Sequence, residues 1–457
     1  MIPVAVGMVD KESEMGDPNS HPAANFSSRG APATEATRVS GVLLSLALLM
    51  AYVGSNDAAA QNAPGANEAS PSPLVDKPPV APEQQKTPVK KDVHHLAPTL
   101  GTEELLAKAV QARKAGLDFL VRTQNKDGSW GSHDPVIANL KDFGFSTSNP
   151  GSNDAVRLAC TAICAQALME TPNRTPPQQA ALNKAQEALL DTAKFAYHKN
   201  ENFNIWGYCY KLDFLTRWLA RDDSKPFRER IRAAAMVCIN GAIRYQQHEG
   251  GWGYYASPNN DFDSMSFTTA NFIIGLQRAK ELGLPVKDGL IEDATEILSQ
   301  MRVPDGSFVY SSGHRRRPTS MLAKLGSGSR TVVAALGLHA VGRLDQKDIK
   351  TSLDVFQEGE NYLEDGRKLI TPHTAAHQIS GYFFFYGYNY ATELATLLGE
   401  DYPVKRWDRL AWTMIRTQED DGRWWDTPMA NYGDKYATGF ALLSLQRYLD
   451  AVGKVDQ

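Results

Sequence analysis

FLVRTQNKDGSWG, residues 119–131, joins a helix end, a glycine and a tryptophan. Apolar residues at helical spacing lead to Gln124, whose side chain can satisfy the free carbonyls of a helix end. Gly128 can take the left-handed conformation that stops a helix. Trp130 can then fold back over the turn and bury its ring. The stretch predicts a helix closed by a tight, aromatic-capped turn.

The same order of residues recurs along the chain. It appears as Gln418…Gly422-Arg423-Trp424, Gln247…Gly251-Trp252 and Gln300…Gly306-Ser307-Phe308. Helical periodicity between these turns predicts outer helices near 103–123, 177–199, 226–247, 287–301, 349–364 and 404–418. Inner helices are predicted near 153–170, 209–221, 263–282, 329–343, 375–398 and 432–450.

The two sets of helices differ in their apolar surface. Inner segments are apolar on most faces, as in residues 331–338, which is typical of a helix buried on both sides. Outer segments carry charge on one face, as in residues 228–232. No segment alternates with period two, so no sheet is predicted. Six such pairs predict an all-α protein, an α6–α6 double-ring toroid.

In this repeated turn the chain resembles the prenyltransferase and squalene cyclase superfamily, whose helices end in Q-x(3–5)-G-x-W/F. The resemblance covers about residues 99–453 and implies a single toroid with a central cavity. Squalene-hopene cyclases protonate an alkene with an Asp-x-Asp-Asp-Thr motif. The nearest run here is Asp261-Phe262-Asp263-Ser264, in which Ser264 replaces the next aspartate.

Zinc-dependent members of the superfamily use an Asp-x-Cys pair and a later histidine. Asp261-Phe262-Asp263 lacks the cysteine, while His373-Thr374 resembles the later His-Thr. The sequence therefore predicts no metal and no cofactor.

The N-terminal region differs in composition from the rest. Gly41–Val53 is apolar and uncharged, and Ala58-Ala59-Ala60 follows it. A transmembrane helix needs about 20 apolar residues, so this pattern favours a signal peptide within residues 1–61. An uncleaved membrane anchor is the alternative. Residues 62–98 are rich in proline and predict a disordered linker, so we expect an exported, periplasmic or cell-surface protein.

Inner helices that run parallel place their N-termini around one mouth of the ring. Free N–H groups gather there. The positional candidates are Asp154, Asp263, Arg330, His373, His377, Tyr432 and Asp434. Asp263 is either a helix cap or, paired with Asp261, a general acid beside Tyr254 and Tyr255.

Two further patterns concern the fifth inner helix. His373 and His377 are four residues apart, which would place both on one helical face. There they could share a metal ion, or they are partly buried or cavity-facing histidines. We treat His377 as a catalytic candidate together with Asp261 and Asp263. Gln378, Tyr382, Tyr386, Asn389 and Glu393 form one helical stripe, which is either core or cavity wall. Rings in such a wall could shield a cation or stack on sugars.

Composition excludes some functions and leaves others open. Lys plus Arg is 48 and Asp plus Glu is 52, a net charge of −4, which argues against a nucleic-acid binder. The leading hypothesis is an isoprenoid (terpenoid) cyclase-like protein. The alternatives are a carbohydrate-active toroid, such as a polysaccharide lyase or hydrolase, and a non-catalytic binding module. An apolar cavity favours the first, an open cleft with paired carboxylates the second, and a filled ring the third.

Overall fold

The computed structural model describes residues 98–131, 150–191, 204–254, 263–316, 324–369, 373–428 and 432–453. The predicted signal region and nearly all of the predicted linker lie outside these segments. No helix within them is long and apolar enough to cross a membrane. Their regular structure is helical, with isolated β-bridges in place of strands.

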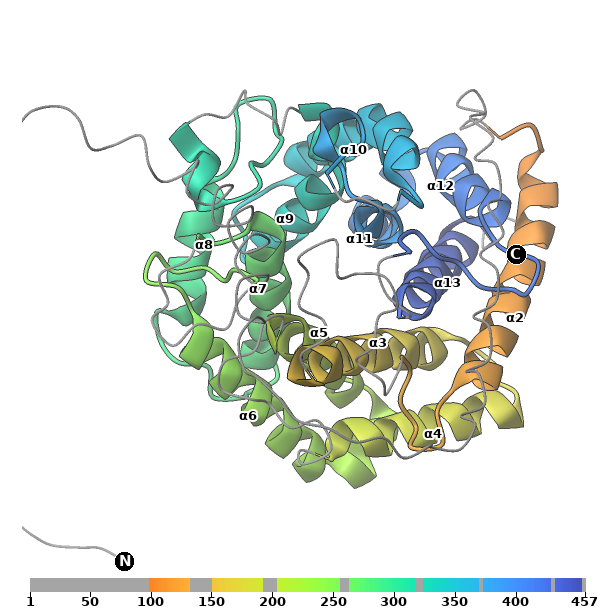
Figure 1. The fold of residues 1–457 in the computed structure, drawn as a ribbon, viewed down its shortest axis with the longest axis horizontal. Helices are drawn as coiled ribbons and strands as arrows, with labels where there is room; N and C mark the ends of the chain where they lie inside the picture. Colours follow the sequence, from red (N-terminus) through yellow and green to blue (C-terminus); the bar gives the residue numbers. More distant parts are fainter. Residues whose placement is uncertain are drawn as a thin grey trace, which may run out of the picture. The chain divides into compact units, whose positions relative to one another are not determined.

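Twelve α-helices in the described residues form two concentric rings (Figure 1). The outer ring holds α2 (Thr102–Thr123), α4 (Pro176–Leu190), α6 (Arg228–Tyr245), α8 (Leu290–Gln300), α10 (Gln346–Gly366) and α12 (Val404–Arg416). The inner ring holds α3 (Pro150–Glu170), α5 (Asn204–Leu219), α7 (Ser266–Glu281), α9 (Gly328–Ala340), α11 (Phe384–Thr396) and α13 (Gly433–Val452). Each inner helix packs against the next, and α13 packs against α3, which closes the ring. The predicted all-α double-ring toroid is confirmed.

The repeated turn fastens each outer helix to its surroundings. Trp252 is fully buried and donates its indole N–H to the Ala242 carbonyl at 2.9 Å. Its backbone N–H bonds Thr269 Oγ1 at 3.0 Å, on the following inner helix. Trp130 and Trp424 make the same pair of bonds, to Leu120 and Thr161 and to Met414 and Thr438. The turn therefore links an outer helix to the inner helix that follows it.

The glutamine of the turn links neighbouring outer helices. Gln124 donates its amide to the carbonyls of Gly128 and Ala181, the latter on α4, at 3.1 and 2.8 Å. Gln418 reaches Ala112 on α2 in the same way, at 2.9 Å. In the third turn Gln246 makes these bonds, to Gly250 and Leu290.

Two predicted registers of the turn were therefore wrong. The third repeat begins one residue earlier than predicted, at Gln246 and not Gln247. In the fourth repeat Arg302, four residues before Gly306, takes the place predicted for Gln300. Arg302 ties its turn to α10 by an ion pair with Asp348 at 2.6 Å.

The glycine of the turn is required by backbone geometry. Gly250 has φ +107°, and a Cβ added there would lie 2.6 Å from the Asp293 carbonyl oxygen on α8. We expect Gly250→Ala to lower the free energy of unfolding by about 3 kcal/mol, through backbone strain and overlap together. Gly283 also has a positive φ, +71°, but open space around it. Gly283→Ala should cost only about 1 kcal/mol, and equal costs in chemical denaturation would contradict the role of close packing.

Two predicted helices differ most from their predicted bounds, and α5 begins at Asn204 instead of 209. The helix α4, Pro176–Leu190, is shorter than predicted, because Asp191 is its C-cap in extended conformation. Residues 192–199 lie outside the described segments. The fifth inner helix begins at Phe384 and not at 375, since the preceding segment forms two 3-10 turns, Ala376–Gln378 and Gly381–Phe383. This second difference decides where the predicted histidines lie.

Candidate functional site

Side chains meet inside the ring from helices that are not neighbours. Tyr210 of α5 contacts Phe440 of α13, although α3 stands between these helices. Phe267 of α7 contacts Phe383, at the start of α11, past α9. Such contacts can only pass through the space that the inner helices enclose, which we call the interior.

A closed series of contacting aromatic rings, which we call the aromatic belt, lies in this interior. Neighbouring rings have centroids 5.2 to 6.0 Å apart. The members, in order, are Trp206, Phe267, Phe383, Tyr386, Phe440 and Tyr210, which contacts Trp206 again. Trp206 and Tyr210 are half-buried, whereas the other four are buried. Solvent therefore reaches the α5 side of the belt.

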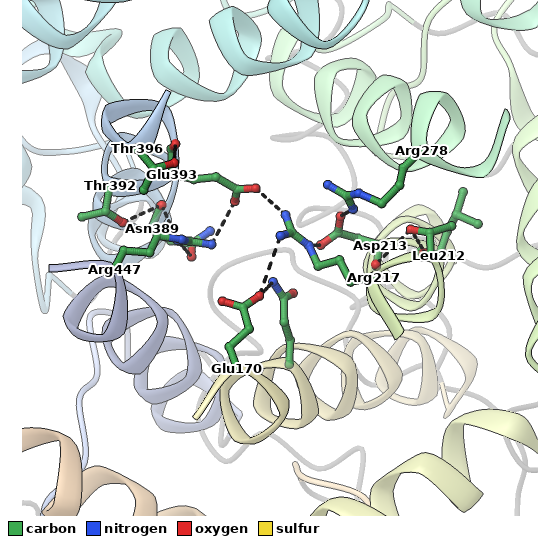
Figure 2. A network of polar contacts seen from close by, with 12 residues as sticks. Glu170, Leu212, Asp213, Arg217, Arg278, Asn389, Thr392, Glu393, Thr396 and Arg447 are labelled. Atoms are coloured by element: carbon green, nitrogen blue, oxygen red, sulfur yellow. Dashed lines mark hydrogen bonds and ion pairs between the residues drawn. The ribbon is translucent and has the colours of Figure 1, made fainter. Parts of the chain in front are cut away.

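Charged residues cross the interior near the C-terminal ends of the inner helices (Figure 2). Arg217 of α5 pairs with Glu393 of α11 on the opposite side of the ring, and with Glu170 of α3 at 3.7 Å. Asp213 joins Arg217 to Arg278 of α7, at 2.9 and 2.5 Å. Arg447 of α13 donates to Glu393 at 3.0 Å. We call these six residues the floor network, because they span the ring at this end.

The N-terminal ends of the inner helices surround the opposite end, the mouth. The repeated turns deliver side chains to it from the position two residues after each buried aromatic. That position holds Tyr254 after Trp252, Tyr310 after Phe308 and Asp426 after Trp424. Tyr254 was predicted as a lining residue. Tyr310 and Asp426 were missed, although their common spacing from the turn would have identified them.

Three tyrosines, Tyr254, Tyr310 and Tyr382, form a cluster at the mouth. The Tyr254 and Tyr310 hydroxyls share a short hydrogen bond, and the Tyr254 hydroxyl lies 3.4 Å from that of Tyr382. Burial raises the pKa of all three phenols, which keeps them neutral.

Arg330 packs beside this tyrosine cluster. It is 4 % exposed and donates to the carbonyls of Phe308 and Gly326 at 2.7 and 2.8 Å. Burial lowers its pKa to about 10, so it is still charged at neutral pH. Arg330 was predicted near the mouth, and the structure places it there as a fixed positive charge.

Asp263 does not cap a helix, which corrects one of its two predicted roles. The helix α7 begins at Ser266 after Met265, and the exposed Asp263 carboxylate accepts a hydrogen bond from Ser311 Oγ at 3.1 Å. Ser311 Oγ also lies 2.7 Å from His314 Nδ1. Burial lowers the pKa of His314, against the opposing charge of Asp263. Asp263, Ser311 and His314 thus form a hydrogen-bonded chain on the rim.

Asp426 is a fully buried carboxyl between the first turns of α11 and α13. It accepts the Phe385 backbone N–H at 3.2 Å and the Tyr436 hydroxyl at 2.5 Å. Burial raises its pKa to about 7, although both hydrogen bonds and the charge of Arg367 act to lower it. Within the described residues, this carboxyl combines complete burial with a hydrogen bond to a half-buried phenol.

The predicted histidine pair is not formed. His373 and His377 both have positive φ, 60° and 56°, and lie in turns before α11, so they share no helical face. The His377 ring packs edge-on against Tyr362 of the outer helix α10, with centroids 4.3 Å apart. His377 is therefore placed against the outer ring and not as a catalytic residue of the mouth. His373 does lie at the mouth, against Tyr310 and Tyr382.

The other predicted site residues lie in different parts of the ring. Tyr386 belongs to the aromatic belt and accepts from Asn271 Nδ2 at 3.2 Å, whereas Asn389 accepts from Arg447 and Glu393 belongs to the floor network. Tyr432 and Asp434 stand at the start of α13, where Lys435 pairs with Asp434 at 3.0 Å. Asp154 pairs with Arg157 at 2.9 Å. Asp261 and Tyr255 lie outside the described residues, so the predicted carboxylate pair stays a prediction.

The described residues contain no group of three or more His, Cys, Asp or Glu side chains suited to a metal ion. The polar side chains at the mouth include the phenols, Arg330, His373 and the carboxyls of Asp263, Asp426 and Asp434. This set can donate protons and hydrogen bonds to a ligand.

Fold and site together define an α/α toroid with an aromatic interior. No family model matches the chain, and no curated protein sequence does. Among solved structures, it is similar to a cellobiose 2-epimerase from Spirochaeta thermophila, with a TM-score of 0.51 and 13 % identity over 78 % of this chain and 100 % of that one.

Two further solved structures are similar over most of the chain. The type II terpene cyclase MstE from Scytonema has a TM-score of 0.45 and 14 % identity, over 75 % of this chain and 98 % of that one. An α-1,6-mannanase variant of Salegentibacter has a TM-score of 0.46 and 10 % identity, over 76 % and 99 %. At 13 % identity, the similarity to the epimerase supports the toroid fold alone and leaves the chemistry to the site.

Proposed function

We propose that the protein binds an isoprenoid or similar apolar chain against the aromatic belt and rearranges it after protonation at the mouth. The belt is the observation that carries this proposal. Six contacting rings lie in the interior, and aromatic faces can stabilise a cationic intermediate. The neutral phenols of the tyrosine cluster add polar contacts without adding charge.

The alternatives require a different interior. A polysaccharide lyase or hydrolase would use an open cleft with paired carboxylates. At the mouth, Asp263 and Asp426 belong to different turns, whereas Asp154 and Asp434 each pair with a cation, Arg157 and Lys435. A ring filled by side chains would support a binding module, yet Trp206, Tyr210 and the tyrosine cluster keep exposed surface. Buried Asn271 Oδ1 has no hydrogen-bond partner among the described residues, and it could accept from a ligand hydroxyl.

The proposal predicts a binding preference. The full chain should bind geranylgeraniol, measured by quenching of tryptophan fluorescence, and should not bind mannotriose or cellobiose. Trp206→Ala should weaken geranylgeraniol binding about tenfold, because a stacked ring of the belt is lost. Trp412→Ala is the matched control, since Trp412 is a half-buried tryptophan of the outer ring. Binding of the saccharides alone would contradict the proposal and favour the carbohydrate-active alternative.

A further inference from the structure

We propose that Asp426 and Tyr436 form the proton donor of the interior, with the Asp426 carboxyl holding the proton and the Tyr436 hydroxyl passing it to a bound ligand. This inference rests on the proposed function and names its acid. It replaces Asp263, the candidate that sequence patterns favour, with a residue two positions after the turn tryptophan Trp424.

The position of Tyr436 suits a relay. It lies in the first turn of α13, is half-buried, and its ring contacts Phe440 of the aromatic belt with centroids 6.1 Å apart. Its hydroxyl lies 2.5 Å from Asp426 Oδ1. Asp426 itself is 0 % exposed, so a ligand cannot touch its carboxyl directly. A proton that leaves Asp426 toward the interior therefore passes through the Tyr436 hydroxyl.

Hydrogen bonding assigns the proton to one carboxyl oxygen. Asp426 Oδ2 accepts the Phe385 N–H, which leaves Oδ1 as the oxygen that faces Tyr436. When Asp426 is protonated, Oδ1 donates to the phenol oxygen, and the phenol O–H is free to turn toward a ligand. When Asp426 is ionised, Tyr436 donates to Oδ1 instead. The pair therefore has one proton-loaded and one unloaded arrangement.

The groups around Asp426 act in opposite directions on its pKa. Burial favours the protonated acid, while the Phe385 N–H, the Tyr436 hydroxyl and Arg367 favour the carboxylate. Arg367 is itself paired with Glu364, and this ion pair reduces the effect of Arg367 on the pKa of Asp426. Tyr432, at the start of α13, and the Cys160 thiol of α3 lie near Tyr436. Burial raises the pKa of both groups, which keeps them neutral. The balance places the pKa of Asp426 at about 7, where a general acid works well at neutral pH.

The proton transfer is balanced as follows. A ligand alkene gives its π electron pair to the Tyr436 proton, so a C–H bond forms as the phenol O–H bond breaks. The phenol oxygen takes the Asp426 proton in the same step. Asp426 ends as a carboxylate, Tyr436 ends neutral, and the ligand carries a positive charge beside the aromatic belt. Later loss of a proton from the ligand reloads Asp426 by the reverse route, so no oxidant or co-reactant is consumed.

Carboxyl titration tests whether Asp426 holds the proton. In full-length protein labelled with ¹³C-aspartate and free of ligand, one carboxyl should titrate near pH 7, and its signal should vanish in Asp426→Asn. A carboxylate that merely caps α11 would titrate below about pH 4. Absence of any aspartate that titrates above about pH 6 would overturn the inference.

Turnover tests whether the proton reaches the ligand. With geranylgeraniol saturating, Asp426→Asn and Tyr436→Phe should each lower product formation about 100-fold with affinity unchanged, and wild-type turnover should fall as pH rises through 7. Asp118→Asn, which changes an exposed carboxyl on the outer helix α2, is the matched control and should keep wild-type turnover. Retained turnover in Asp426→Asn, or loss confined to Asp263→Asn, would overturn the pair. A wild type that does not bind geranylgeraniol overturns the proposed ligand, while the titration still decides whether Asp426 holds the proton.

Discussion

Replacement of Arg217 by Met should lower the free energy of unfolding by about 3 kcal/mol, measured by chemical denaturation at pH 7. Arg217 contacts Glu170, Asp213 and Glu393, and its side chain is 19 % exposed. Methionine fills similar volume but leaves these carboxylates without their shared cation inside the ring. Removal of one partner from a buried ion network costs more than the network itself contributes. Because the Arg217 side chain is partly exposed, the expected loss lies at the lower end of the range of about 3–5 kcal/mol for breaking a buried ion pair.

The matched control is an ion pair on the outer surface. Arg230 pairs with Glu187 at 2.7 Å, but their side chains are 52 % and 55 % exposed. Arg230→Met should change the free energy of unfolding by less than about 0.5 kcal/mol. Equal losses in the two variants would show that the floor network is no better shielded from solvent than the surface pair.

The floor network should also make the fold sensitive to acid. Burial acts to raise the pKa of Glu393 and Asp213, but the neighbouring arginines outweigh it and lower both values below 4.5 and 3.8. A carboxyl with a lowered pKa stabilises the fold above its ordinary pKa and loses that contribution as pH falls through the folded value. Stability should therefore decrease below about pH 4, and Arg217→Met should lose less over this range than wild type.

The fold followed from the sequence because one short pattern reports long-range structure. Gly128, Gly250 and Gly422 each approach the next outer helix too closely for any Cβ, and the tryptophans that follow are fully buried. The residues that end each helix locally are therefore the same residues that pack against the neighbouring helices. The predicted third register was wrong because Gln246 and Gln247 are adjacent, and the bonds of Gln246 to Gly250 and to Leu290 on α8 distinguish them.

The site could be predicted from the sequence less completely than the fold, for a physical reason. His373 and His377 fit a helical spacing, but residues before Phe384 form turns with positive φ, which no apolar periodicity reveals. Asp426 carries no motif of its own, and its chemistry comes from complete burial beside Tyr436, a residue ten positions away. The position two after the turn aromatic was the available signal, and it required comparison of the repeats with one another.

Trp424→Ala should lower the free energy of unfolding by about 4 kcal/mol. Trp424 is fully buried between Gly116 of α2 and the inner ring, and it donates its indole N–H to the Met414 carbonyl at 2.7 Å. Alanine leaves a cavity the size of an indole and removes the partner of that carbonyl. Thermal and chemical denaturation should both report the loss.

The adjacent Trp425 is the control for this last change. It is half-buried, and Lys368 Nζ lies 4.3 Å from its ring centroid, so Trp425→Ala removes mainly a surface cation–π contact of about 1 kcal/mol. Because the two residues are neighbours, both substitutions have similar effects on the backbone. The difference between their losses in unfolding free energy therefore measures the contribution of burying Trp424 under the turn. If Trp424→Ala unfolds within about 1 kcal/mol of Trp425→Ala, the aromatic of the repeat does not fasten the two rings together. A larger loss in Trp424→Ala would show that the outer and inner rings are held together at this turn, which also places Asp426 at the mouth.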